Sequence, residues 1–272
     1  MDRRSFVAAL SAAPLVAGIG GLRAFSGRPG VQLYTVRDAM AEDADRTLAT
    51  LAEIGYREVE LAGTYGMTPA AFRRSLDAAG LRAVSGHVDY PQERGDVQRA
   101  LDAAAELGHE LLVIPWLPED LRTGDGYRSV AARLNRFGEA ARAMNLRLGY
   151  HNHAFEFEET DGIVPMSLLL DATSPALVDW QMDIFWTVHG GVDPFAQLEA
   201  HSGRITSVHV KDRTTGGEMV DVGDGVIDFT AVLAAAEDQG LRHAFVEHDN
   251  PEDAIVSVRK AHAHLRSIGV IA

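Results

Sequence analysis

The chain has 272 residues, of which 46% are hydrophobic, so it can bury a full core as one large α/β domain or two small ones. Its 39 acidic residues outnumber its 25 basic ones, and the formal net charge of −14 argues against a nucleic-acid partner. The absence of cysteine excludes disulfides, thiolate metal sites and a cysteine nucleophile.

The first 25 residues differ in character from the rest of the chain. Arg3 and Arg4 precede Phe6 and a mildly apolar stretch rich in alanine and glycine, which resembles a twin-arginine export signal. A frayed helix or a membrane anchor is the alternative, but the stretch is interrupted by Pro14 and glycines and is short for a spanning helix. We therefore expect an exported, periplasmic protein without stable membrane anchoring after signal removal.

From Gly30 onward, short apolar runs typical of strands alternate with segments of helical period. In the first such segment Leu48, Leu51 and Ile54 share one face, and several segments end in glycine, a common helix cap. Strands that alternate with helices of this length indicate right-handed βαβ units and a parallel sheet. The predicted strands are residues 31–36, 58–62, 82–88, 110–116, 147–153, 177–186, 205–211 and 244–248.

Eight strand–helix units within residues 30–270 match a single (β/α)8 barrel. An open doubly wound sheet is the alternative fold. It would normally carry a glycine-rich phosphate-binding turn after its first strand, and residues 32–37 contain no glycine. No linker or repeat indicates a second domain.

The last three predicted strands each end in a residue that can bind a metal. Asp183, His209 and Glu247 lie 26 and then 38 residues apart, about one strand–helix unit per step. Parallel barrel strands present their carboxyl ends to one shared pocket, where two carboxylates and an imidazole would form a divalent-metal site. An ordinary buried or solvated polar residue is the alternative for each of the three.

The fifth and seventh predicted strands carry further polar side chains. His151 and His153 are two residues apart and should face the same way, as should His209 and Lys211. Lys211 is therefore expected to point into the same cavity as His209, with a solvated charge at the rim as the alternative.

Six stretches carry motifs of one known family: residues 30–38, 150–157, 182–186, 190–194, 208–212 and 223–228. By these motifs the chain resembles the xylose isomerase-like superfamily, in its sugar phosphate isomerase/epimerase group. The resemblance covers residues 30–270. It implies a (β/α)8 barrel that acts on a small sugar, without naming which sugar.

The resemblance also implies one divalent metal, manganese, magnesium, cobalt or zinc, held by strands 5 to 8. Asp183, His209 and Glu247 match three of the family's ligands. On strand 5 the family's glutamate is replaced by His151, so the fourth ligand is either His151 or Glu156 from the following loop. We favour Glu156, because a third oxygen ligand suits a hard metal.

In this family the metal stabilises an enediolate formed by proton removal next to a carbonyl. Two bases on opposite faces would give epimerisation, whereas one base and one acid would give isomerisation or elimination. The catalytic candidates are Glu247, His151, His153 and Lys211. A histidine-rich strand 5 also occurs in relatives acting on inosose and 3-keto-glycosides, so a metal-dependent lyase or hydratase is the alternative.

Four further residues are candidates for substrate binding. Trp116 and Trp186 would form apolar walls against the sugar, with core packing as the alternative, and Glu60 and His87 would bind its hydroxyls. Relatives often form dimers or tetramers, so a homo-oligomer is an expectation. An endonuclease IV-like nuclease and a non-catalytic sugar-binding protein are more distant alternatives, opposed by the acidic charge and by the intact ligand set.

Overall fold

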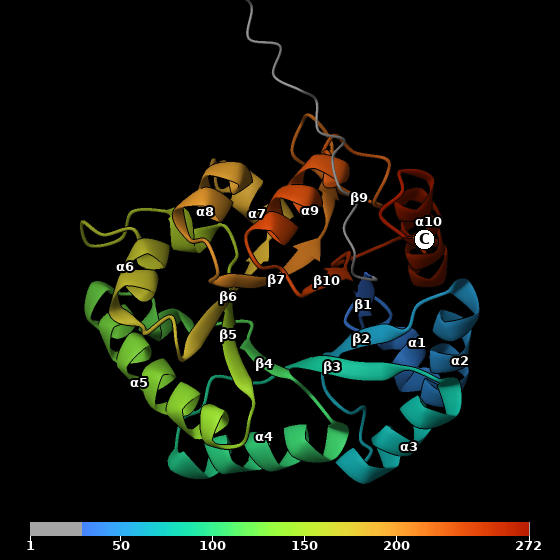
Figure 1. Ribbon diagram of the computed structural model, residues 1–272, viewed down its shortest axis with the longest axis horizontal. Helices are drawn as coiled ribbons and strands as arrows, with labels where there is room; N and C mark the ends of the chain where they lie inside the picture. Colours follow the sequence, from blue (N-terminus) through green and yellow to red (C-terminus); the bar gives the residue numbers. More distant parts are fainter. Residues whose placement is uncertain (1–28, 272) are drawn as a thin grey trace, which may run out of the picture.

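The computed structural model of the protein describes residues 29–271, so the predicted export signal at residues 1–25 lies outside the described part. Eight parallel strands close a barrel, and helices surround it (Figure 1). Around the barrel the strands follow the order β1, β10, β7, β6, β5, β4, β3 and β2. The predicted (β/α)8 barrel is confirmed, and the open doubly wound sheet is excluded.

All eight barrel strands coincide with the predicted runs to within a few residues. They are β1 (Gly30–Gln32), β2 (Glu58–Leu61), β3 (Arg82–His87), β4 (Leu111–Ile114), β5 (Arg147–His151), β6 (Val178–Asp183), β7 (Ile205–Val210) and β10 (His243–Val246). A separate antiparallel hairpin, β8 (Asp212–Arg213) and β9 (Met219–Val220), follows β7.

The sixth predicted strand was expected to continue to residue 186, and this is wrong. The backbone turns after Asp183 because its carboxylate accepts a hydrogen bond from the Trp186 amide at 2.9 Å. Asp183 thereby caps the amino end of a short helix, α7. One residue thus ends the strand, starts the helix and stands at the mouth of the barrel.

The helices begin and end where local signals place them. Thr68 accepts a hydrogen bond from the Ala71 amide, Pro69 is the first residue of its helix, and Gly80 ends it at a φ of 71°. None of the helices in the described part is long and apolar enough to cross a membrane. They are α1 (Arg37–Glu42), α2 (Ala44–Ile54), α3 (Pro69–Ala79), α4 (Arg94–Leu107), α5 (Gly124–Ala143), α6 (Pro165–Ala172), α7 (Ile184–His189), α8 (Pro194–Ala200), α9 (Phe229–Asp238) and α10 (Ala254–Ser267), with single 3-10 turns η1 (Glu119–Leu121) and η2 (Phe155–Phe157).

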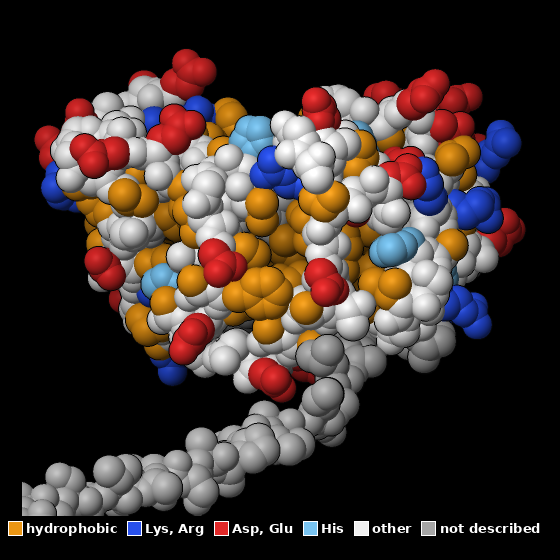
Figure 2. All heavy atoms as spheres, turned by 90° about the horizontal axis from the view of Figure 1, so that it is seen from above, with side chains coloured by type: hydrophobic (Ala, Val, Ile, Leu, Met, Phe, Trp, Pro, Cys, Tyr) orange, Lys and Arg blue, Asp and Glu red, His pale blue; other side chains and the backbone are white. Residues whose placement is uncertain are grey.

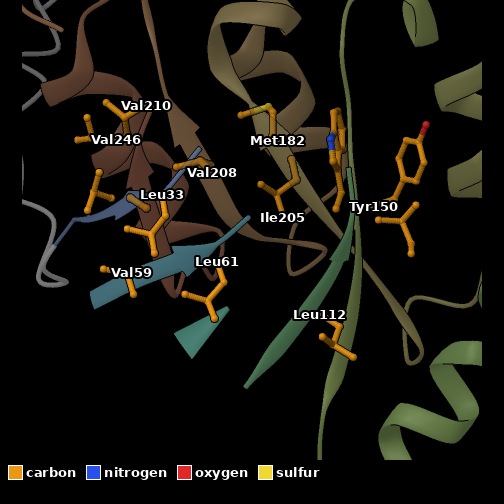
Figure 3. Packing of buried hydrophobic residues seen from close by; sticks show 14 of the residues in the cluster. Leu33, Val59, Leu61, Leu112, Tyr150, Met182, Ile205, Val208, Val210 and Val246 are labelled. Carbon is orange, nitrogen blue, oxygen red and sulfur yellow. The ribbon is translucent and has the colours of Figure 1, made fainter. Parts of the chain in front are cut away.

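The hydrophobic core lies between the strands and the surrounding helices. Successive strand residues alternate between the two faces of the sheet, and one set is apolar. Figure 3 shows members of this set side by side on neighbouring strands, among them Val208 and Val210 of β7 and Met182 of β6. The same alternation turns His209 and Asp183 toward the barrel interior.

The barrel interior is polar near its carboxyl end. The Gln181 amide of β6 donates a hydrogen bond to the Glu60 carboxylate of β2, on the other side of the barrel, at 2.7 Å. Both residues are fully buried. Because a buried polar side chain is costly without partners, this interior network fixes the side chains beneath the mouth of the barrel.

Candidate metal and active site

Asp183, His209 and Glu247, called here the metal triad, meet at the carboxyl end of the barrel. They come from β6, β7 and the residue after β10, and one potential ligand atom of each lies within 4.8 Å of the others. All three side chains are buried. The structure thus brings together the three residues whose spacing predicted a shared pocket.

The donor set fits a divalent metal. Asp183 Oδ2 is a buried oxygen that accepts no hydrogen bond within the described part of the chain, although it forms an ion pair with Lys211. His151 Nε2 lies 3.7 Å from it, so a second imidazole adjoins the triad. Two carboxylates and two imidazoles form a mixed nitrogen and oxygen set of the kind that binds manganese, cobalt or zinc.

Burial and neighbouring charges shift the pKa values of the triad residues in different directions. Burial raises the pKa of Asp183 to about 6. For Glu247 burial alone would raise the pKa, but the nearby charges of Lys211 and His209 lower it, so this carboxylate stays ionised. Burial alone would lower the pKa of His209, and the carboxylates of Glu247 and Glu60 raise it to about 10.

Glu60 lies beneath the triad. Its side chain is fully buried, and its carboxylate contacts the side chains of several other strands. Four of them donate hydrogen bonds: Gln32 Nε2 at 2.8 Å, Ser85 Oγ at 2.6 Å, Gln181 Nε2 at 2.7 Å and His209 Nε2 at 2.6 Å. His87 Nε2 lies 3.1 Å from the carboxylate. The predicted role of Glu60 in binding substrate hydroxyls stays a prediction, and the contact with His209 adds a role in positioning that ring.

His87 and His151 form a cluster of imidazoles with His209. The ring centroid of His151 lies 4.5 Å from that of His209, and the His87 ring stacks on His209 at 5.4 Å. The Gln181 side-chain oxygen lies 3.0 Å from His87 Nε2 and 3.1 Å from His151 Nδ1. His87, predicted to bind substrate, thus stands at the edge of the triad, where it remains a candidate for that role.

Lys211 points into the site, as its spacing from His209 predicted. Its ammonium lies 3.0 Å from Asp183 Oδ2, 2.8 Å from Glu247 Oε2 and 2.7 Å from Asp249 Oδ1. Burial alone would lower the pKa of Lys211, but these carboxylates raise it, so the group stays charged. The alternative of a solvated charge at the rim is excluded, since the side chain is only 2% exposed.

Glu156, the favoured fourth ligand, is turned away from the triad. Its carboxylate accepts hydrogen bonds from Tyr150 Oη at 2.7 Å and from the His153 amide at 2.7 Å. Tyr150 points to the outer face of β5, because neighbouring strand residues alternate. His151, the other candidate for the fourth ligand, faces inward, with its Nε2 3.7 Å from Asp183 Oδ2. Burial raises the pKa of Glu156 to about 7.

An aromatic rim adjoins the triad on the side of β4, β5 and α7. The ring of His153 lies 4.9 Å from Trp116, 5.0 Å from His151 and 5.6 Å from Trp186. Trp116 is 47% exposed at this rim. His153 Nδ1 and Trp186 Nε1 are buried and have no protein partner among the described residues. The rim therefore offers both apolar faces and polar atoms without a partner among the described residues.

Four residues that shape the site were not among the predicted site residues. Gln32, Ser85 and Gln181 hold Glu60, and Asp249 binds Lys211. The inward direction of Gln181 could have been found from strand alternation, since it lies two residues before Asp183. The partners of these side chains could not, because each lies on a different strand.

With this geometry in place, a comparison with known families decides the membership. The model of the family described as the xylose isomerase-like TIM barrel matches residues 48–268. The chain belongs to this family. The resemblance to xylose isomerase-like proteins, predicted from the motifs, is thereby confirmed.

Individual members of the xylose isomerase-like family are only distantly similar to the chain. An inosose dehydratase of Geobacillus kaustophilus is 25% identical, over 70% of this chain and 74% of that protein. The rhizopine catabolism protein MocC of Rhizobium meliloti is 24% identical, over 73% and 72%. Among solved structures, a sugar phosphate isomerase/epimerase from Parabacteroides distasonis is 26% identical with a TM-score of 0.80, over 96% of this chain and 100% of that one.

Proposed function

We propose that this protein is a divalent-metal-dependent sugar isomerase or epimerase that removes a proton from the carbon next to the carbonyl of a sugar or keto-sugar. The observation that carries the proposal is the convergence of the metal triad, in which Asp183 Oδ2 is a buried oxygen that accepts no hydrogen bond from the described residues and forms an ion pair with the Lys211 ammonium. A bound manganese, magnesium, cobalt or zinc ion would act as a Lewis acid on the carbonyl and its neighbouring hydroxyl.

The side chains around the triad can move the proton. Glu247 is ionised and can accept a proton from carbon. Burial lowers the pKa of His153 to about 3 and that of His151 well below its usual range, so both imidazoles are neutral near pH 7. They stand on β5 and the loop after it, across the mouth from Glu247, where a second base would act on the other face of the substrate.

The aromatic rim would bind the sugar. Trp116 and Trp186 can pack on C–H faces of the ring, while Trp186 Nε1 and His153 Nδ1 lack protein partners among the described residues and can bond to its hydroxyls. His87 adjoins the cluster and can contact a hydroxyl near the reacting carbon. The Arg122 guanidinium lies over the Trp116 ring at 4.1 Å from its centroid, so the rim also carries a cation.

Elimination of water from an inosose or a 3-keto-glycoside is the second candidate function, and one feature favours it. Lys211 is a buried ammonium beside two triad carboxylates and can supply a proton to a leaving hydroxyl. The curated relative named inosose dehydratase is consistent with this chemistry. Isomerisation and elimination share the first proton removal and differ in the step after it.

Removal of the first proton can be tested directly. The metal-loaded protein, incubated in heavy water with a panel of ketoses, inososes and 3-keto-glycosides, should place deuterium on the carbon next to the carbonyl. A labelled epimer or isomer in the mass and NMR spectra supports the isomerase, and a product short of one water supports the lyase. A panel without exchange or turnover would contradict both.

Glu247→Gln should abolish this exchange, with turnover falling by about 10²- to 10⁴-fold, because the amide cannot accept the proton. Glu252→Gln is the matched control, since Glu252 is an exposed glutamate five residues further along the chain. Full exchange activity in a folded Glu247→Gln protein would contradict the assignment. Metal analysis adds a check: one equivalent supports the enzyme, several a nuclease, and none a binding protein.

A further inference from the structure

Lys211 is a cation enclosed by the site that should hold a metal. Its side chain is 2% exposed, and its ammonium contacts three carboxylates at 2.7 to 3.0 Å. Lysine is rarely buried to this degree unless it is paired. Two of the three partners, Asp183 and Glu247, belong to the metal triad, whereas the third, Asp249, does not.

This arrangement makes the ammonium and a metal ion share ligands. Any cation bound between Asp183 and Glu247 would lie close to the Lys211 charge, because the ammonium contacts both carboxylates and all three side chains are buried. Like charges at such separations repel strongly where water is excluded. The ammonium also neutralises part of the negative charge that would attract the metal.

Asp249 acts in the opposite direction. It binds Lys211 at 2.7 Å from the outer side, with a side chain that is 26% exposed. Its negative charge offsets the ammonium and draws it away from the two triad carboxylates. The metal site therefore adjoins an ion pair. Lys211 contacts the two triad carboxylates, and Asp249 contacts Lys211 from the outer side.

We propose that Lys211 lowers the metal affinity of this site, so that a bound metal ion can exchange, and that Asp249 counteracts this effect. In the metal-free protein the Lys211 ammonium neutralises part of the negative charge of the triad. The inference rests on the proposed function, because it requires a metal at the triad. It depends on charge and distance alone. A purely structural ion pair would instead affect stability and leave metal affinity unchanged once the protein is folded.

Chelator competition with Mn²⁺ tests this inference. Lys211→Met keeps most of the length of the side chain and removes its charge, so the dissociation constant for Mn²⁺ should fall by about tenfold or more. Lys260→Met is the matched control, because Lys260 also pairs with two carboxylates, Asp221 and Asp224, but is 43% exposed. Its dissociation constant should stay within about twofold of the unaltered protein, since exposed pairs are screened.

Asp249→Asn provides the reverse test and should raise the dissociation constant, because Lys211 then loses its outer counter-charge. This variant decides the matter if Lys211→Met does not fold. The inference is overturned if folded Lys211→Met binds Mn²⁺ no more tightly than the unaltered protein, or, where only Asp249→Asn folds, if its affinity is unchanged. If the unaltered protein itself binds no Mn²⁺, the proposed function fails first, so the two failures are distinguishable.

Discussion

At the scale of single residues, a carboxylate buried beneath the triad holds one of its members. Glu60 lies under His209 and binds its Nε2 at 2.6 Å, while His209 Nδ1 faces Glu247 at 2.6 Å. A carboxylate that contacts one ring nitrogen of a metal-binding histidine fixes the orientation of the ring. It also keeps the hydrogen on that nitrogen, so that the other nitrogen can bind the metal. Glu60 therefore presents His209 Nδ1 to the triad.

Loss of this contact should show in metal binding. Glu60→Gln should weaken Mn²⁺ binding by about 10- to 100-fold, the usual effect of losing such a partner. Ser85→Ala is the matched control, because it removes another hydrogen bond to the same carboxylate, 2.6 Å long, without touching His209. Chelator competition and the visible spectrum of the Co²⁺ form would report the change. An unaltered affinity and spectrum in folded Glu60→Gln would refute the positioning role.

At the scale of elements, the hairpin β8–β9 and the loop after it are held beside the site by one buried aspartate. Asp212 directly follows Lys211 and is 1% exposed. Its carboxylate accepts hydrogen bonds from the amides of Gly223 at 3.0 Å, Gly225 at 3.1 Å and Ile227 at 3.2 Å. A Cβ on Gly225 would collide with this carboxylate, which explains glycine at that position.

Asp212→Ala should therefore loosen residues 214–227 and cost roughly 2–4 kcal/mol of unfolding free energy, because three backbone amides lose a charged acceptor. Chemical denaturation would measure the stability and limited proteolysis the loosening. Asp224→Asn is the control, since Asp224 lies in the same loop but is exposed and pairs with Lys260. Equal proteolysis rates for the Asp212→Ala and unaltered proteins would contradict this account.

At the scale of the whole molecule, the 39 acidic residues outnumber the 25 basic ones. The face in Figure 2 carries acidic and basic side chains interspersed around its rim, with no continuous basic patch among the described residues that it shows. Together with the net charge of −14, this favours a small-molecule substrate over a nucleic acid.

We propose that residues 1–25, which lie outside the described part, direct export of the whole protein. Residues 1–30 fused to a folded reporter should carry it across the membrane only while the arginine pair is intact. Replacing Arg3 and Arg4 together by lysine should stop export, and replacing Arg23 alone should not. Normal export of the double variant in a fractionation experiment would refute the signal.

The barrel and the metal triad could be predicted from the sequence. Strands and helices show in local periodicity, so all eight barrel strands were located to within a few residues. Asp183, His209 and Glu247 were expected to meet, because parallel strands place their carboxyl ends at one edge and the triad residues end consecutive barrel units.

The contacts between side chains around that triad became known from the tertiary structure alone. The sequence favoured Glu156, but strand alternation and the Tyr150 hydroxyl turn it outward and leave His151 beside Asp183. Glu60 lies 149 residues from His209 and meets it only because the barrel closes. Such contacts depend on register and closure, which no local pattern in the chain encodes.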